Sequence, residues 1–220
     1  VGQLGSGTGQ LLFGAVFSVG LMLVVIAGAE LFTGNNMFLS ICAFEGKTTW
    51  GHVLYHWAVV WVANFLGALL LVFLMFKGFY YALPDGSMAS GLLGGAVMKK
   101  ALAIAAAKCS LPWDAAFCRA ILCNWLVCLA VWLALAAQDV IGKMFACFFP
   151  IMAFVASGFE HSVANMFFVP MGIFIAGGAD PLLNWSNFLV NNLLPVTLGN
   201  ILGGGIFVAG FYWWSYLRVK

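Results

Sequence analysis

Residues 156–170 read ASGFEHSVANMFFVP, which places an adjacent glutamate and histidine, Glu160 and His161, inside an otherwise apolar run. The run extends over about 143–175, and it is longer than the roughly 20 apolar residues that cross a bilayer. Irregular backbone at membrane depth is tolerated only where it is buried in protein or lines a cavity. The pattern therefore predicts two half-helices joined by a break at Glu160 and His161, with polar surroundings at the break.

The composition of the 220 residues is that of a membrane protein, with 64% hydrophobic and 7% charged residues. A soluble globular domain carries about 25% charged residues. We therefore expect a multi-pass protein whose apolar surface faces the lipid bilayer, and the nine Trp and 21 Phe suit aromatic belts at the two membrane interfaces. The net charge of +2, with no basic run beyond Lys99 and Lys100, argues against a nucleic-acid partner.

Four further apolar segments are long enough to be spans, at 11–31, 53–76, 115–137 and 188–217. The first of them is followed by LFTGNNMFLSICAF, a polar break and then a short apolar piece, so it also predicts a broken helix. The long connection at 78–114 is predicted to carry a short surface helix. The sequence thus predicts an all-α membrane protein with about five spans, two of which are broken.

The two broken segments resemble each other. GAELFTGNNMF at 28–38 and SGFEHSVANMF at 157–167 both hold an acid and a hydroxyl residue, and both close on Asn-Met-Phe. The spans that follow them also match and set Asn64 against Asn200, so we expect these two asparagines to tie loop backbone together. An odd number of spans separates the copies, which therefore insert with opposite orientation, as in inverted-repeat transporters and channels. We predict that the two broken helices meet near the midplane at the substrate site.

The repeat also predicts the domain organisation. Residues 1–220 are expected to form a single transmembrane channel domain, with inverted halves at roughly 1–77 and 112–220 and a connection at 78–111. The second half has a span before its broken helix, and the first half has no counterpart of it. We therefore expect six spans in the complete repeat, with the first one missing from this sequence by truncation.

Four motifs resemble the formate–nitrite transporter family, and together they cover nearly the whole chain. They are SGFEHSVANMFFVPMGI, the LFTGN break, NWLVCLAVW at 124–132 and PVTLGNILGGG at 195–205. FEHS and FVPMGI are most similar to the formate channels, whereas the GNN after Thr33 is closer to the nitrite branch, and Glu30 stands where the formate channels carry Asp. The resemblance implies an aquaporin-like fold of six spans, a homopentamer with one pore in each subunit, and no cofactor or metal.

The resemblance also implies which residues line the pore. It places a central pair at His161 and Thr33 and a vestibule lysine at Lys108. Asn124 and Glu160 would belong to the polar surroundings of the histidine. The apolar constrictions of the family correspond to Phe17, Leu21, Leu31 and Phe154.

These residue types indicate how an anion could cross. A carboxylate-sized ion costs of order 20 kcal/mol to move into a medium of low dielectric constant, and apolar constrictions dewet a pore. Half-helix N-termini offer free N–H donors and roughly half a positive charge. Histidine titrates near pH 6.5, so it can donate a proton or a charge-assisted hydrogen bond. We predict a pH-dependent channel of the cell membrane for small monovalent anions, in which Lys108 concentrates the anion and His161, with Thr33, stabilises or protonates it.

Formate is the favoured substrate, and nitrite or hydrosulfide is the alternative within the same family. A more distant alternative is a membrane-embedded metal-dependent hydrolase that uses His52, His56, Glu30, Glu160 and His161. The spacing of His52 and His56 suits a metal, but no H-E-x-x-H motif or nucleophile–base set accompanies them, so we expect no enzyme and place both histidines at the membrane interface. A structural scaffold is a further alternative, and it would conduct nothing.

Overall fold

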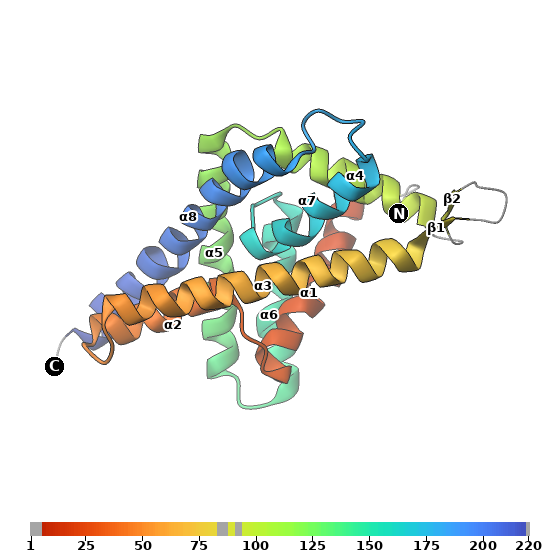
Figure 1. Cartoon of the computed structure of the whole chain (residues 1–220). Helices are drawn as coiled ribbons and strands as arrows, with labels where there is room; N and C mark the ends of the chain where they lie inside the picture. Colours follow the sequence, from red (N-terminus) through yellow and green to blue (C-terminus); the bar gives the residue numbers. More distant parts are fainter. Residues whose placement is uncertain (1–5, 83–87, 91–93, 219–220) are drawn as a thin grey trace.

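The computed structural model describes residues 6–82, 88–90 and 94–218 (Figure 1). Helices account for most of these residues, and the rest lie in connecting turns and in a hairpin of two three-residue strands. The elements in chain order are α1 (Ser6–Ala27), α2 (Phe32–Phe44), α3 (Trp50–Phe79), β1 (Tyr80–Ala82), β2 (Met88–Ser90), α4 (Gly94–Cys109), α5 (Trp113–Ala136), α6 (Val140–Ala156), α7 (Ser162–Ala176), η1 (Asn187–Leu193), α8 (Leu194–Leu202), η2 (Gly203–Gly210) and η3 (Trp213–Leu217).

Among the described residues, four helical stretches are long and apolar enough to cross a membrane: Gly7–Ala27, Trp50–Phe79, Trp113–Ala136 and Asn187–Leu217. The last one combines η1, α8, η2 and η3 into one continuous helical rod with π-helical turns. The predicted span at 143–175 is divided into α6 and α7, which are two shorter apolar helices. The chain is therefore an all-α membrane protein with two broken helices, α1–α2 and α6–α7.

Each broken helix ends its first half at a glycine in the left-handed conformation. Gly28 has a φ of 82° and Gly158 a φ of 69°, a backbone conformation that residues with a Cβ rarely adopt. After each glycine the next amide bonds back across five residues, as from Phe159 N–H to the Phe154 carbonyl. This pattern closes a helix C-terminus and turns the chain away from the axis.

Each second half begins after an N-cap residue in extended conformation. Leu31 precedes α2 with φ −127° and ψ 120°, and His161 precedes α7 with φ −118° and ψ 118°. The two glycines and the two N-caps are equally spaced, and they fix the register of the repeat. The match on Asn-Met-Phe is wrong by one residue: Asn35, not Asn36, corresponds to Asn165. The Asn-Met-Phe letters of the two segments match in sequence, but the residues that carry them do not occupy equivalent positions after the two turns.

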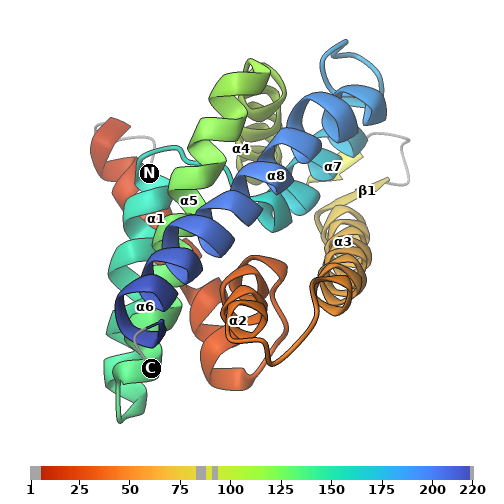
Figure 2. The same cartoon turned by 90° about the vertical axis from the view of Figure 1, so that its left-hand side faces the viewer.

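The helices pack around these breaks. In the first half α1 lies along α6, and α2 contacts α3 and η2. In the second half α5 packs against α6 and α8, while α3 and α4 both cover α7. Figure 2 shows the α1–α6 pair on one side of α2 and α3 on the other. The second halves, α2 and α7, thus pack among the other helices, and their first residues Phe32, Thr33 and Ser162 are buried, whereas Gly28 and Gly158 of the two turns are exposed.

The short helix expected in the long connection is present as α4, with one exposed face, where Lys99 and Lys100 lie, and one buried face. This helix packs against α7, with Met98, Ala105 and Cys109 buried. The approach is so close that a Cβ added to Gly172 would collide with Ala105. Ala105 of α4 and Gly172 of α7 are the small residues that permit this contact.

The last helical rod approaches α5 equally closely. A Cβ at Gly199 would lie 2.5 Å from the carbonyl oxygen of Phe117, and one at Gly203 would collide with the carbonyl of Ile121. Two small residues four positions apart allow such backbone contact between membrane helices. The contact brings Asn200, which lies between them, against α5.

Candidate functional site

The centre of the site is a direct contact between the two broken helices. The Thr33 hydroxyl, in the first turn of α2, lies 3.0 Å from Nε2 of His161, the N-cap of α7. Both residues are buried. The structure thus brings together the two residues of the predicted central pair, 128 positions apart in the chain.

The histidine ring is held at both nitrogens. Its Nδ1 accepts the backbone N–H of Ala164 at 3.1 Å, which satisfies one of the free amides at the start of α7. The proton of the neutral ring is therefore on Nε2, and Nε2 donates it to the Thr33 oxygen. The Thr33 hydroxyl keeps its own hydrogen, which it can donate to a third group.

Glu160 belongs to a closed ring of buried polar side chains. Its Oε1 accepts from the Lys108 ammonium at 2.9 Å, and its Oε2 accepts from Asn165 at 2.7 Å. Asn165 also donates to Asn192 at 2.7 Å, and Asn192 donates to the Lys108 carbonyl at 3.0 Å. The Lys108 and Glu160 side chains are only 14% and 4% exposed, so each charge is neutralised by the other in a largely dehydrated place.

The Asn200 side chain hydrogen-bonds to the backbone of the second break. Its Nδ2 donates to the Glu160 carbonyl at 3.0 Å and to the Ala120 carbonyl of α5 at 2.9 Å. Its Oδ1 accepts the Ser162 N–H at 2.8 Å. The amide therefore binds the backbone on both sides of His161.

Asn64 grips the first break in the same way. Its Oδ1 accepts the Phe32 N–H at 3.0 Å, and its Nδ2 donates to the Glu30 carbonyl at 3.1 Å. Here the residue enclosed by the two bonds is Leu31. The two asparagines therefore tie loop backbone together, as expected, and they do so at equivalent atoms of the repeat.

Asn124 connects the two breaks through α5. Its Nδ2 donates to the Thr33 carbonyl at 3.1 Å and to the Asn200 carbonyl at 2.7 Å. The Cys128 thiol, one turn later, donates to the Thr33 carbonyl at 3.5 Å and to Asn124 Oδ1 at 3.6 Å. Asn124 thus supports the backbone of Thr33 instead of contacting the histidine.

The four predicted constriction residues lie in one apolar cluster: Phe17, Leu21, Leu31 and Phe154. The rings of Phe17 and Phe154 meet edge to face at 5.9 Å between centroids. Phe154 in turn stacks on the His161 imidazole at 6.0 Å and 21°. The apolar cluster and the polar Thr33–His161 pair are therefore immediate neighbours.

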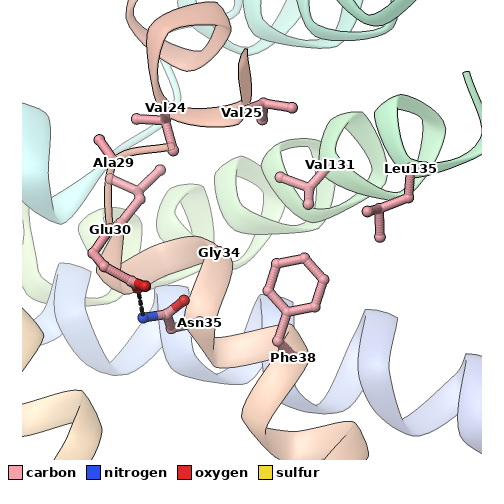
Figure 3. A pocket seen from close by; sticks show the side chains of 10 residues that line it. Val24, Val25, Ala29, Glu30, Gly34, Asn35, Phe38, Val131 and Leu135 are labelled. Carbon is pink, nitrogen blue, oxygen red and sulfur yellow. Dashed lines mark hydrogen bonds between the residues drawn. The ribbon is translucent and has the colours of Figure 1, made fainter. Parts of the chain in front are cut away.

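A cavity of about 260 Å³ adjoins the first break (Figure 3). It is lined mainly by apolar side chains such as Phe38 and Val131, and Leu31 belongs to its wall. The Glu30 carboxylate in this wall accepts from Asn35 at 2.7 Å. Neither Thr33 nor His161 lines the cavity, whereas Leu31 and Gly34, on either side of Thr33 in the chain, do.

Further contributing residues were not among the predicted site residues. Asn192 and Cys128 bond within the polar networks, and Phe168 stacks on Phe17 at 6.3 Å. The polar pair Asn191–Asn192 inside an apolar span is a signal that could have indicated Asn192. Cys128 and Phe168 are ordinary residues of apolar helices, and only the fold assigns them to the site.

The histidines of the hydrolase alternative lie elsewhere. The rings of His52 and His56 are 6.1 Å apart on the first turns of α3, with His52 exposed. Among the residues that the structure describes, no three His, Cys, Asp or Glu side chains are grouped to hold a metal ion. The polar groups of the centre are instead joined by hydrogen bonds beside a buried imidazole.

Comparison with known proteins adds independent findings. A profile of the family described as Formate/nitrite transporter matches residues 1–214. The chain is 50% identical over 222 residues to a protein of Methanothermobacter thermautotrophicus named "Probable formate transporter", and the match covers 97% of this chain and 77% of that protein. It is 36% identical over 209 residues to the nitrite transporter NirC of Escherichia coli (strain K12), covering 93% of this chain and 71% of that protein.

One solved structure, described as "Pentameric formate channel with formate bound", superposes on this chain with a TM-score of 0.81 at 38% identity. The superposition covers 98% of this chain and 86% of that one. The similarity therefore extends over the fold and over nearly the whole sequence, both breaks included.

Proposed function

The chain belongs to the formate/nitrite transporter family, and on that premise we propose that it is a pH-dependent channel for small monovalent anions with formate as its main substrate. Its relatives are transporters and channels, so the protein acts in membrane transport and is not an enzyme. We further propose that it forms a homopentamer in the plasma membrane. The pentameric assembly of the solved relative supports this.

The identities support formate over the alternatives. The chain is 50% identical to a protein named as a probable formate transporter and 36% identical to one named as a nitrite transporter. Nitrite and hydrosulfide remain the alternative substrates, because both are small monovalent anions and the GNN after Thr33 resembles the nitrite branch.

The observation that carries the proposal is the 3.0 Å contact between Thr33 and His161 beside the apolar cluster. An anion that enters this cluster loses its water, and a bare carboxylate costs of order 20 kcal/mol to bury. Two N-termini of half-helices and two side-chain donors at one point offset part of that cost. The anion takes a hydrogen bond from the Thr33 hydroxyl, and the Nε2–H of His161 turns from the Thr33 oxygen to the anion.

Proton transfer is the second step that we propose, and the resting ring geometry sets its conditions. Loss of the Nε2 proton from a neutral ring would leave an imidazolate, so the donor must be an imidazolium. In that form Nε2–H breaks, an O–H bond forms on formate, and the ring becomes neutral. The imidazolium also carries a proton on Nδ1, which then cannot accept from Ala164 N–H. The ring must therefore release its helix cap to act as an acid.

The benefit of protonation lies in the apolar cluster. Formic acid is neutral, and burying a neutral polar group costs roughly 2–7 kcal/mol, far below the cost for the ion.

The charged groups nearest the histidine are Glu160, in its own turn, and Lys108 from α4, which bond to each other. Among the described residues, the uncharged polar groups around the histidine include Thr33 from α2 and, from α5, Asn124 and the Cys128 thiol.

Flux into proteoliposomes tests the proposal, with formate, nitrite and hydrosulfide compared at about pH 5 and about pH 7, on the two sides of the ordinary histidine titration. We expect formate to move fastest and its flux to rise at the lower pH. His161→Phe should abolish this pH dependence. His52→Phe is the matched control, because His52 is exposed on α3, and it should keep the dependence.

Three outcomes are informative. Equal pH dependence in His161→Phe and the wild type would refute the histidine mechanism. Faster nitrite or hydrosulfide flux would favour the alternative substrate and leave the pore intact. Absence of flux for every anion tested would favour the alternative that the protein is a structural scaffold.

A further inference from the structure

We propose that Asn64 and Asn200 are a matched pair of positioning residues, each of which sets the direction of one pore side chain. Asn64 directs Leu31 and Asn200 directs His161. The inference rests on the proposed function in one respect, since it takes Leu31 and His161 as groups that the anion meets.

The geometry at the second break shows how one amide can direct a side chain. The Glu160 carbonyl belongs to the peptide plane before the His161 Cα, and the Ser162 N–H belongs to the plane after it. Asn200 binds both of them, at 3.0 and 2.8 Å. A peptide plane is rigid, so fixing the two planes fixes φ and ψ of His161 and with them the Cα–Cβ direction.

The first break repeats this arrangement around Leu31. Asn64 binds the Glu30 carbonyl and the Phe32 N–H at 3.1 and 3.0 Å. The outcome is nearly the same backbone conformation, with φ −127° and ψ 120° at Leu31 against φ −118° and ψ 118° at His161. Because the repeats are inverted, the two side chains enter the centre from opposite halves of the fold.

Asn200 is anchored by more hydrogen bonds than Asn64. Asn200 is fully buried, makes a further bond to the Ala120 carbonyl, and has its own carbonyl bound by Asn124. The Glu160 amide also donates to the Arg119 carbonyl of α5 at 3.4 Å. Asn64 is half-buried, and within the part of the chain that the structure describes its side chain bonds only to the turn. The histidine is therefore tied to α5, while Leu31 is tied to α3 through one side chain.

This difference separates positioning from a general structural role. A residue that only stabilises the fold would lower expression and thermal stability without changing which ions pass or how flux depends on pH. A positioning role predicts that Asn200 acts through His161. Asn200→Ala should therefore have almost no further effect once His161 is replaced.

Transport in single and double variants gives the first test. Asn200→Ala should lower formate flux at about pH 5 by about tenfold or more, since small misplacements of a reacting group cost this much. It should also remove the pH dependence. In the His161→Phe background Asn200→Ala should change flux less than about twofold, as coupled sites require. Asn64→Ala should keep the pH dependence and raise the leak of larger anions such as acetate. Its effect on flux should be the same in the wild type and in the His161→Phe background.

Asn191→Ala is the matched control. Asn191 lies in the same helical rod as Asn200, is exposed, and bonds to Asn187. It should leave flux and its pH dependence unchanged. Asn200→Ser replaces Asn200→Ala if the alanine variant does not assemble, and thermal unfolding confirms that the compared variants are folded.

The closing experiment reads the histidine directly by ¹⁵N NMR of histidine-labelled protein, which is practical because the chain has three histidines. The wild type should show His161 as the neutral tautomer with its proton on Nε2, assigned by the loss of the signal in His161→Phe. Asn200→Ala should mix the two tautomers, whereas Asn64→Ala and Asn191→Ala should not.

An unchanged His161 signal in Asn200→Ala would overturn the inference even if the channel conducts formate. A changed signal in a protein that moves no formate would retain the positioning role and reject the proposed function. Non-additive flux without the tautomer change would also count against it.

Discussion

At the residue scale, His161 has two tasks in the resting structure. Nδ1 caps α7 through Ala164, and Nε2 faces Thr33. A serine or asparagine would cap a helix as well, but neither would leave a second nitrogen at the junction of the two breaks. The site therefore depends on an imidazole held at a helix start, and its neighbours can be tested one atom at a time.

Removal of the Thr33 hydroxyl tests the central contact. Thr33→Val keeps the shape of the side chain and leaves the buried Nε2–H without its acceptor, which costs about 1–3 kcal/mol of stability. We expect formate flux to fall by about tenfold or more, because the anion loses a donor at the centre. Thr33→Ser retains the hydroxyl and should keep most of the flux. Similar rates in the valine and serine variants would contradict the role of the hydroxyl.

The Lys108–Glu160 pair gives a prediction for stability. Lys108→Met leaves a carboxylate that is 4% exposed without its counter-ion, and loss of one partner of a buried pair costs about 3–5 kcal/mol. Lys108→Met with Glu160→Gln removes both charges and should recover much of this loss. Thermal unfolding of the two single variants and the double variant measures the loss and the recovery of stability. A double variant less stable than either single one would contradict the pairing.

At the element scale, the sequence predicted the breaks well and their packing poorly. The apolar run interrupted by Glu160 and His161 is a local signal, and so is the repeat of Gly-x-Glu at both breaks. The exact register of the repeat was wrong because the Asn-Met-Phe match competes with the turn geometry. The burial of α4 against α7, and the contributions of Asn192 and Cys128, arise from contacts between remote segments, which leave no periodic signal in the sequence.

The glycines of the breaks allow a matched test of the turns. A Cβ at Gly28 or Gly158 meets no atom within 4 Å, so the cost of alanine there is that of the left-handed backbone alone, about 1–2 kcal/mol. Gly67→Ala, in the middle of α3 and equally free of contacts, should instead be neutral or stabilising by up to about 1 kcal/mol. Denaturation in detergent compares the three variants. Equal effects at all three positions would refute the argument from backbone conformation.

At the scale of the whole molecule, much apolar surface lies on the outside. Val16 of α1 and Leu54 and Leu66 of α3 are 72%, 60% and 60% exposed. Such surface is stable against lipid or against other subunits. The division into inverted halves at 1–77 and 112–220 remains a prediction, although the equivalent grips of Asn64 and Asn200 support it.

The proposed pentamer and the site make a joint prediction about cooperation between subunits. Thr33 contacts His161 and Asn124, and Lys108 contacts Glu160, and each of these contacts is made within one chain. Each subunit should therefore conduct independently. In vesicles that hold mixed pentamers of wild-type and His161→Phe chains, the pH-dependent part of formate flux should rise in direct proportion to the wild-type fraction. If one defective chain silenced its whole pentamer, flux would follow about the fifth power of that fraction, and half wild type would give only about 3% of the signal. A steep curve of that kind would place the path between subunits and contradict a pore built from the residues of one chain.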